Sequence, residues 1–244
     1  MMPLYRDVGV VLRTHKLGES DRIVTLITQE SGKVRAVAKG VRKPGSRFGS
    51  RLEPMSHVQL QLYRGRDLDI VNQVELVETA NRTRGSLEST TDGLAMCEVV
   101  EQLSHDRQPT PDLYRMLVGA LRQLNTKYSA LVLPALQLRL LAAEGVGPCV
   151  DRCVVCGVAD ALCSLDVAAG GLLCQTHRRA GATSDAAIGI VRQILAGRVS
   201  GVLAQDDLAE RTIAEVVAYA RAATEHHLER RIRSSSLFEA PRIG

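Results

Sequence analysis

Four residues in the second half of the chain could together hold a metal ion. Cys153, Cys156, Cys174 and His177 follow the pattern C-x2-C-x17-C-x2-H. Each short turn can aim two ligand atoms at one point, and about 15 to 20 residues between two such pairs is typical of zinc sites. Because the protein would supply all four ligands of the tetrahedron, the spacing predicts a structural Zn²⁺ that activates no water.

The spacing leaves the fourth ligand open. His177 mirrors the spacing of the first pair and is the residue we expect, but Cys149 lies four residues before Cys153 and could take its place. Without a metal, the cysteines would act as small buried hydrophobic residues. A redox pair of the thioredoxin type is disfavoured, because no alternating strand and helix pattern surrounds Cys153 and Cys156.

The first third of the chain carries a run of positive charge. From residue 33 to residue 51 there are seven basic residues and no acidic one, although the net charge of the whole chain is only +4. Such a cationic surface is what a polyphosphate partner requires. Phe48 lies within the run, where an exposed ring could stack on an unpaired base. The predicted DNA-binding residues are Lys33, Arg35, Lys39, Arg42, Lys43, Arg47, Phe48 and Arg51.

Structural explanations of the same run stay open. Charged runs are often solvated surfaces, and strands use Lys and Arg to protect their edges from pairing. The ring of Phe48 could equally fill the core. In the strand expected here, alternate residues share one face. Lys33, Arg35 and Lys39 would then face the solvent, while the small apolar residues between them would face the interior.

No pattern typical of a catalytic centre accompanies these residues. The sequence has no G-x4-G-K-[ST] phosphate loop, no G-x-S-x-G motif and no H-E-x-x-H motif. The closest carboxylates, Asp67 and Asp69, fall in an expected hairpin turn. His226 and His227 fall near the end of a long helix, where positive charge is favourable, and Cys97 is expected in the core. We therefore predict no catalytic residue and no enzymatic activity.

The elements that must position these residues change in kind near residue 80. Short segments rich in β-branched residues, partly alternating between apolar and polar, predict five strands before that point. Five short strands within about 70 residues suit a small closed barrel of the OB type, and the count also suits an SH3-like barrel. The expected strands are 8–18, 22–30, 33–41, 57–64 and 68–76.

Helical spacing of apolar residues replaces this pattern after about residue 84. Thr-Pro-Asp at 110–112 is typical of a helix start, and Glu-Gly at 144–145 of a helix end. We predict an α+β protein, with an OB-type barrel domain at 1–80 and a helical domain at 81–244 that a zinc-knuckle insertion interrupts at about 148–178. The expected helices are 86–104, 111–125, 130–145, 184–197 and 206–232.

The composition favours a reducing compartment. The opening MMPLYRDVGV has no apolar segment of a signal peptide, and the chain has no run of about 18 apolar residues that could span a membrane. We therefore expect a cytoplasmic protein with reduced cysteines and no membrane partner. Aromatic residues make up only 3% of the chain, so the core is expected to consist of Leu, Val, Ile and Ala.

Residues 5–54, YRDVGVVLRTHKLGESDRIVTLITQESGKVRAVAKGVRKPGSRFGSRLEP, resemble the N-terminal domain of the RecO family of bacterial DNA repair and recombination mediators. The likeness rests on LGESDRIVTLIT, on the G-x-V-x-x-V-A-K-G-x-R-x-x-x-S run and on R-F-G-x-x-L-E-P. The later C-x-x-C-G and G-G-L-L-C also resemble the zinc knuckle of that family. The likeness is strong to about residue 80, moderate through the zinc segment and weak in the helices.

The resemblance implies an OB-fold domain followed by a helical domain with a zinc-binding element. It implies binding of single- and double-stranded DNA, annealing of complementary strands, and help in loading RecA onto strands coated with single-strand binding protein. The implied partners are RecR and the acidic C-terminal tail of single-strand binding protein, with RecA filaments reached indirectly and a location at the nucleoid. The run from Lys33 to Arg51 corresponds to the basic DNA-binding region of the family.

The chain departs from many relatives at one point, where Cys174 and His177 replace a second cysteine pair. This departure again leaves the fourth ligand open between His177 and Cys149. Two other functions are kept as alternatives to the DNA-binding mediator. One is a protein-interaction scaffold of a repair complex, and the other is an accessory subunit of an enzyme that acts on nucleic acid.

Overall fold

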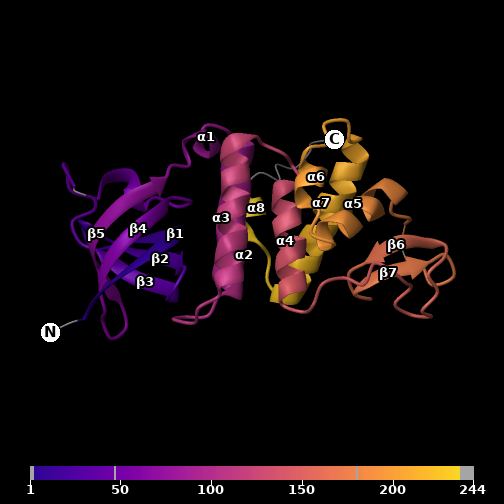
Figure 1. The fold of residues 1–244 in the computed structure, drawn as a ribbon, viewed down its shortest axis with the longest axis horizontal. Helices are drawn as coiled ribbons and strands as arrows, with labels where there is room; N and C mark the ends of the chain where they lie inside the picture. Colours follow the sequence, from indigo (N-terminus) through magenta and orange to yellow (C-terminus); the bar gives the residue numbers. More distant parts are fainter. Residues whose placement is uncertain (1–2, 47, 180, 237–244) are drawn as a thin grey trace. The chain divides into compact units, whose positions relative to one another are not determined.

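The computed structural model in Figure 1 describes residues 3–46, 48–179 and 181–236. The chain forms two compact units. The first contains the residues up to Lys127 together with the described residues from Ile232 onwards, and the second is Tyr128–Arg231. The first unit therefore includes helices from both sides of the second unit in the sequence.

Five strands of the first unit form a closed barrel in the order β1-β2-β3-β5-β4. The strands are β1 (Leu4–Leu17), β2 (Asp21–Thr28), β3 (Gly32–Ala38), β4 (His57–Tyr63) and β5 (Asp69–Glu78). The long strand β1 pairs first with β4 and then with β2, and β3 and β5 are the parallel pair. The expected five-stranded barrel of the OB type is confirmed.

The interior of the barrel is filled almost entirely by aliphatic side chains, as the low aromatic content predicts. A short 3-10 helix, η1 (Gly49–Leu52), follows the basic loop and places Leu52 in the same core. The buried residues of this core are Val11, Val24, Leu26, Ala36, Ala38, Val41, Phe48, Leu52, Val58, Leu60, Leu62, Val71 and Val74. Burial alternates along β3, which fixes the face that each of its side chains presents.

The seam between β3 and β5 is short, because backbone pairing between them covers two residue pairs. The earlier part of β3 pairs instead with a segment far along the sequence. Lys33 forms a bridge with Asp106, and the N–H of Arg107 donates to the Lys33 carbonyl oxygen at 2.9 Å. A loop outside the five strands thus completes this side of the barrel.

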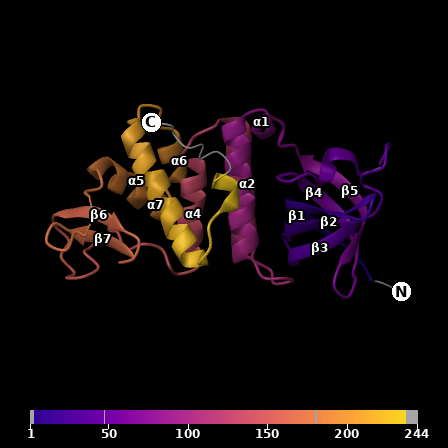
Figure 2. The ribbon, with the colours of Figure 1, turned by 180° about the vertical axis from the view of Figure 1, so that it is seen from behind.

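The helices of the first unit are α1 (Asn81–Arg84), α2 (Leu87–Leu103), α3 (Pro111–Thr126) and α8 (Arg233–Ser236). Helix α2 begins after Ser86, whose hydroxyl accepts a hydrogen bond from the N–H of Ser89. Helix α3 begins at the proline that the sequence predicts for its first turn. Figure 2 shows α8 beside α2, where the Glu98 carboxylate accepts hydrogen bonds from the N–H groups of Arg233 and Ser234.

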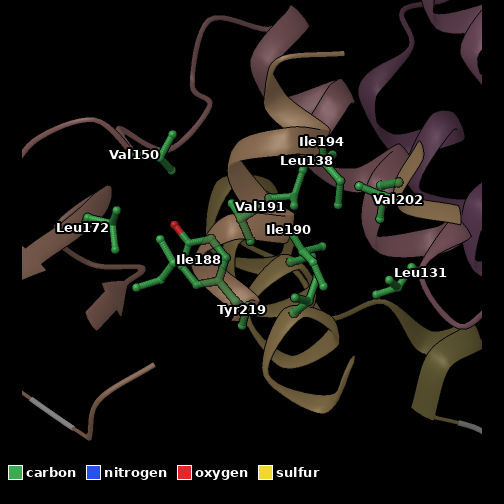
Figure 3. Packing of buried hydrophobic residues seen from close by; sticks show 14 residues of the cluster. Leu131, Leu138, Val150, Leu172, Ile188, Ile190, Val191, Ile194, Val202 and Tyr219 are labelled. Atoms are coloured by element: carbon green, nitrogen blue, oxygen red, sulfur yellow. The ribbon is translucent and has the colours of Figure 1, made fainter. Parts of the chain in front are cut away.

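The second unit consists of α4 (Val132–Ala143), α5 (Asp185–Leu195), α6 (Val199–Leu203), α7 (Glu210–Leu228) and a hairpin of β6 (Leu162–Asp166) and β7 (Gly171–Cys174). Helix α4 ends where the sequence predicts, with Gly145 at a φ of 78°. Figure 3 shows the core between these elements, with Leu138, Ile188, Val191 and Ile194 among its members. No helix in the described part of the chain is long and apolar enough to cross a membrane.

The cysteine-rich segment is held together by backbone hydrogen bonds and packs on the helical core through apolar side chains. The N–H of Cys149 donates to the Gly170 carbonyl oxygen at 3.0 Å, and the N–H of Leu172 donates to the Cys149 carbonyl oxygen at 2.8 Å. The side chains of Val150 and Leu172 belong to the main core cluster of the unit. The segment is therefore part of the packed unit and not a loose appendage.

Candidate nucleic-acid interface and metal centre

Strand β3 presents the expected two faces. Val34, Ala36 and Ala38 are at most 1% exposed and face the barrel core, whereas Arg35 is exposed. Lys39, in the turn that follows the strand, is also exposed. The alternation that the sequence predicts for this strand is confirmed, and it places the Arg35 guanidinium on the outer face of the barrel.

Lys33 has a different environment from the other cations of the run. Its ammonium group donates to the carbonyl oxygens of Ser104 at 2.6 Å and Glu101 at 3.2 Å, and lies 3.4 Å from the Asp106 carboxylate. These carbonyls belong to the C-terminal end of α2, where unpaired C=O groups and the helix dipole favour a cation. The side chain is 17% exposed. Lys33 therefore attaches the barrel to α2, which leaves its charge less accessible to a phosphate.

The basic loop after β3 folds back against the turn between β1 and β2. The N–H of Arg42 donates to the Ser20 carbonyl oxygen at 2.9 Å, and the N–H of Gly40 donates to Oδ1 of Asp21 at 2.7 Å. The hydrogen bond from Gly40, followed by one from the Ser20 hydroxyl, lowers the pKa of the Asp21 carboxyl. Arg42 and Lys43 are exposed on this anchored loop.

Phe48 points into the barrel and not toward a ligand. Its side chain is 1% exposed and packs within the barrel core. Stacking on a base requires an exposed ring face, so the structure corrects that expectation, and Phe48 instead fixes the end of the basic loop to the barrel. Arg51 is exposed on η1, and Arg47 lies outside the described residues.

The pairing of β1, β2 and β3 places further residues on the outer face of the barrel, outside the run from residue 33 to residue 51. Arg13 on β1 is level with Thr25 on β2, and Thr25 is level with Arg35 on β3. Side chains of directly paired residues lie on the same face of a sheet. Arg13 is 53% exposed and pairs with Glu101 at 2.7 Å. The same register aligns His15, Ile23 and Val37 in the next row. In the sequence, the spacing of two residues between Arg13 and His15 indicates that both lie on one face of β1.

The four expected metal ligands meet in the second unit, with all ligand atoms within 4.8 Å of one another. Sγ of Cys174 lies 3.3 Å from Nδ1 of His177 and 3.9 Å from Sγ of Cys156. Sγ of Cys153 lies 3.9 Å from Nδ1 of His177. A tetrahedral Zn²⁺ with ordinary bond lengths separates such ligand atoms by about 3.5 to 3.8 Å. The quartet therefore fits a zinc ion.

Cys149 is not part of this quartet. Its Sγ lies 3.8 Å from the Arg152 carbonyl oxygen, and its backbone pairs with the hairpin. Burial opposes ionisation of the Cys153 and Cys174 thiols, but hydrogen bonds from neighbouring backbone N–H groups outweigh it and lower the pKa of both. A hydrogen bond from the Val158 N–H favours the Cys156 thiolate, but burial and the neighbouring Cys153 and Cys174 outweigh it and raise the pKa of Cys156. Backbone donors therefore favour the thiolate at two of the three cysteines, which suits a site for a dication.

The Asp67 and Asp69 pair forms no carboxylate cluster for a catalytic metal. Asp69 is fully buried, contrary to the solvated turn that we expected, and accepts hydrogen bonds from Arg107 at 2.8 Å and the Tyr5 hydroxyl at 2.5 Å. Burial opposes ionisation of Asp69, but the hydrogen bonds from Arg107, Tyr5 and Gly65 outweigh it and lower its pKa. Within the described residues, the cysteine and histidine quartet is the group of three or more side chains that could hold a metal.

The fold and these sites define a class of protein, in which a closed OB-type barrel with a cationic outer face is followed along the chain by helices and by a hairpin segment that carries a metal-ligand quartet. Two protein-family models match the chain. The model described as "Recombination protein O N terminal" matches residues 1–80, and "Recombination protein O C terminal" matches residues 84–236. The chain belongs to the RecO family of DNA repair proteins.

Three curated relatives cover almost the whole chain, and each is named DNA repair protein RecO. The relative from Frankia casuarinae is 43% identical over 244 residues, which is 98% of this chain and 99% of that protein. The relative from a Nocardioides species is 41% identical over 97% of this chain and 99% of its own length. The relative from Thermobifida fusca is 41% identical over 98% of this chain and 99% of its own length.

Proposed function

We propose that this chain is a non-enzymatic DNA-binding protein of recombinational repair. It would bind single- and double-stranded DNA, anneal complementary strands and help to load the recombinase onto strands coated with single-strand binding protein. The observation that carries this proposal is the acid-free cationic run on the outside of a closed OB-type barrel. The exposed members of the run are Arg35, Lys39, Arg42, Lys43 and Arg51.

The physical basis of annealing is charge screening. Two DNA strands repel each other through their phosphates, and a cationic surface that binds both lowers this repulsion. Register places Arg13 of β1 on the same face as Arg35, although Thr25 between them is buried and Arg13 pairs with Glu101. In the next row, Ile23 and Val37 are partly exposed and apolar. Phosphate contacts position a strand without reading its sequence. We therefore expect binding that depends strongly on salt and weakly on base sequence.

The quartet in the second unit would hold one structural Zn²⁺. Cys153, Cys156, Cys174 and His177 would fill its coordination shell, so no position is left for a reacting water. The ion would join the knuckle at residues 153–157 to strand β7 and support the packing of the second unit. Metal analysis of the purified protein tests this, and one zinc per chain is expected.

The proposed protein partners follow from family membership. They are RecR and the acidic C-terminal tail of single-strand binding protein, with RecA filaments affected indirectly, and the protein would act in the cytoplasm at the nucleoid. Co-purification of the full chain with RecR, or with a peptide ending in that acidic tail, tests each contact. Failure to bind either partner at low salt would contradict this part of the proposal.

A salt titration of binding to single-stranded DNA tests the central claim. The logarithm of the affinity should fall linearly with the logarithm of salt concentration, with a slope of about −0.7 for each phosphate that is neutralised. The variant Arg42→Glu/Lys43→Glu should bind more weakly and have a slope smaller in magnitude by about 1.4. Arg82→Glu is a matched control, because Arg82 is exposed on α1 in the same unit and outside the run.

Three outcomes would contradict the proposal. Affinity that does not depend on salt would remove the electrostatic basis of binding. Equal losses in the double variant and the Arg82→Glu control would mean that the run is not the interface. Cleavage of labelled DNA or turnover of ATP in the presence of Mg²⁺ would favour the accessory subunit of an enzyme, and no DNA binding at low salt would favour the scaffold.

A further inference from the structure

The four members of the metal-ligand quartet differ in their access to solvent. Cys153 and Cys174 are 1% and 4% exposed, and both belong to a small buried cluster with Leu173. Cys156, which lies in the same knuckle as Cys153, is exposed. Among the three cysteines of the quartet, Cys156 is therefore the residue most accessible to a reagent dissolved in water.

A second thiol lies within reach of the exposed one. Sγ of Cys174 is 3.9 Å from Sγ of Cys156. A disulfide bond is about 2.05 Å long, so an approach of about 2 Å would join these two sulfur atoms. Cys156 lies next to Gly157, at a φ of 76°, and Cys174 is the last residue of β7, before the turn that leads to His177.

We propose that Cys156 is a thiol-oxidation site for hydroperoxides, with Cys174 as the resolving residue. In the first step, the sulfur of Cys156 attacks one peroxide oxygen, the O–O bond breaks, and the released oxygen leaves as water after taking up a proton. Cys156 then carries a sulfenic acid. In the second step, the sulfur of Cys174 attacks the sulfur of Cys156, the S–OH bond breaks and a second water leaves. Two thiolates have lost two electrons, and hydrogen peroxide has been reduced to two water molecules.

This oxidation would change the second unit, because the disulfide removes two of the four ligands from the quartet. The knuckle contacts β7 through a hydrogen bond from the N–H of Val154 to the Leu172 carbonyl oxygen at 3.0 Å. The side chain of Leu172 belongs to the main core of the unit. Loss of the ion would therefore release a segment that packs directly on the helical core.

The chain supplies its own reference thiol. Cys97 is 1% exposed on α2, and burial raises its thiol pKa to about 12. A reagent dissolved in water does not reach a thiol buried in the core, so Cys97 should stay reduced under conditions that oxidise the exposed Cys156.

The inference rests on the proposed zinc site, so the test begins with metal content. The zinc-loaded full chain is titrated with hydrogen peroxide while released zinc is followed with a chromophoric chelator. A cyclic 1,3-dione traps sulfenic acid, and peptide mapping without reduction locates adducts and disulfides. We expect a dione adduct on Cys156, a bond between Cys156 and Cys174, and one zinc released per chain. A protein purified without zinc would contradict the proposed metal site, whereas a zinc protein that resists peroxide would contradict this inference alone.

Two variants sharpen the test. Cys156→His keeps a zinc ligand at the position and removes the exposed thiol, so it should hold zinc at peroxide concentrations that strip the wild type. Cys163→Ser is a matched control, because Cys163 lies on β6 outside the quartet, and it should respond like the wild type. Equal zinc release from Cys156→His and the wild type would overturn the inference. If Cys156→His binds no zinc, the peptide map of the peroxide-treated wild type becomes the test. A first dione adduct on any cysteine other than Cys156 would then overturn the inference.

Discussion

The cations of the acid-free run divide into two groups by what their side chains contact. Lys33 donates to the last carbonyls of α2 and is mostly covered, whereas Arg35, two residues later on the same strand, is exposed. The sequence places both on the same face of β3, and the structure does too. Their roles nevertheless differ, because a helix end packs over one and solvent covers the other.

This difference predicts opposite phenotypes for two substitutions. Lys33→Ala should lower the free energy of unfolding by about 1 to 2 kcal/mol, because it removes charge-assisted hydrogen bonds to the α2 carbonyls. It should change the salt slope of DNA binding little. Arg35→Ala should cost less than about 0.5 kcal/mol of stability and reduce the slope in magnitude by about 0.7. Urea unfolding and salt titration of the same two proteins separate these effects, and similar results for both variants would contradict the assignment.

Residue types and spacing predicted some of the site and could not predict the rest. The metal quartet was predictable because each pair lies within one turn, where chain geometry is local. The burial of Phe48 and the position of Lys33 against α2 depend on residues that are distant in the sequence. Alternation along a strand tells which face a side chain occupies, but it does not tell what covers that face.

At the scale of elements, the loop between α2 and α3 completes the barrel. It pairs with β3 at Lys33 and delivers Arg107 to the buried carboxylate of Asp69, at the start of β5. Gly32 begins β3 at a φ of 70°, and a Cβ added there would lie 1.9 Å from the Gln108 carbonyl oxygen. Gly32 therefore permits a close backbone approach that holds this loop in the seam.

Replacement of this glycine should open the seam. Gly32→Ala combines a left-handed backbone with a clash against main-chain atoms that cannot rotate away, so we expect a loss of about 3 kcal/mol or more. Gly18→Ala is the matched control, because its φ is 57° but nothing lies within 4 Å of an added Cβ. It should cost about 1 kcal/mol from backbone strain alone. Urea unfolding measures both, and equal losses would show that the loop does not need this close approach.

The long elements were predictable and the short ones were not. The five strands and five long helices were all expected from periodicity, with ends that differ by a few residues. The helix expected at 206–232 ends at Leu228, because Glu229 adopts a left-handed conformation with a φ of 50°. Helices α1, α6 and α8, of four or five residues each, are too short to show a period. The β6–β7 hairpin is set by its packing and by the approach of Cys149, which no local pattern reveals.

At the scale of the whole molecule, the chain has two compact units with separate cores. The barrel core and the core of the second unit share no residue, and the quartet lies in the second unit. The first unit continues beyond the barrel through α2 and α3. We therefore propose residue 80 only as the end of the barrel domain. We expect each of the two compact units to have its own free energy of unfolding.

This organisation predicts that metal removal affects one unit and spares the other. A structural ion contributes folding free energy to the part of the protein that binds it. Chelation should therefore lower hydrogen-exchange protection in residues 149–158, in β6 and β7, and in the adjoining helix α5. Protection of the five barrel strands should stay unchanged, and the affinity for single-stranded DNA should stay within about twofold, since regions of a protein can open independently.

Hydrogen-exchange mass spectrometry on the full chain, with and without a chelator, measures both units in one experiment. Cys174→Ser should reproduce the effect of the chelator, because Cys174 is a buried member of the quartet. Cys163→Ser should not, because Cys163 lies outside it. Parallel loss of protection in the barrel strands would mean that the two units unfold as one. It would also mean that metal loss affects the barrel surface that we propose binds DNA.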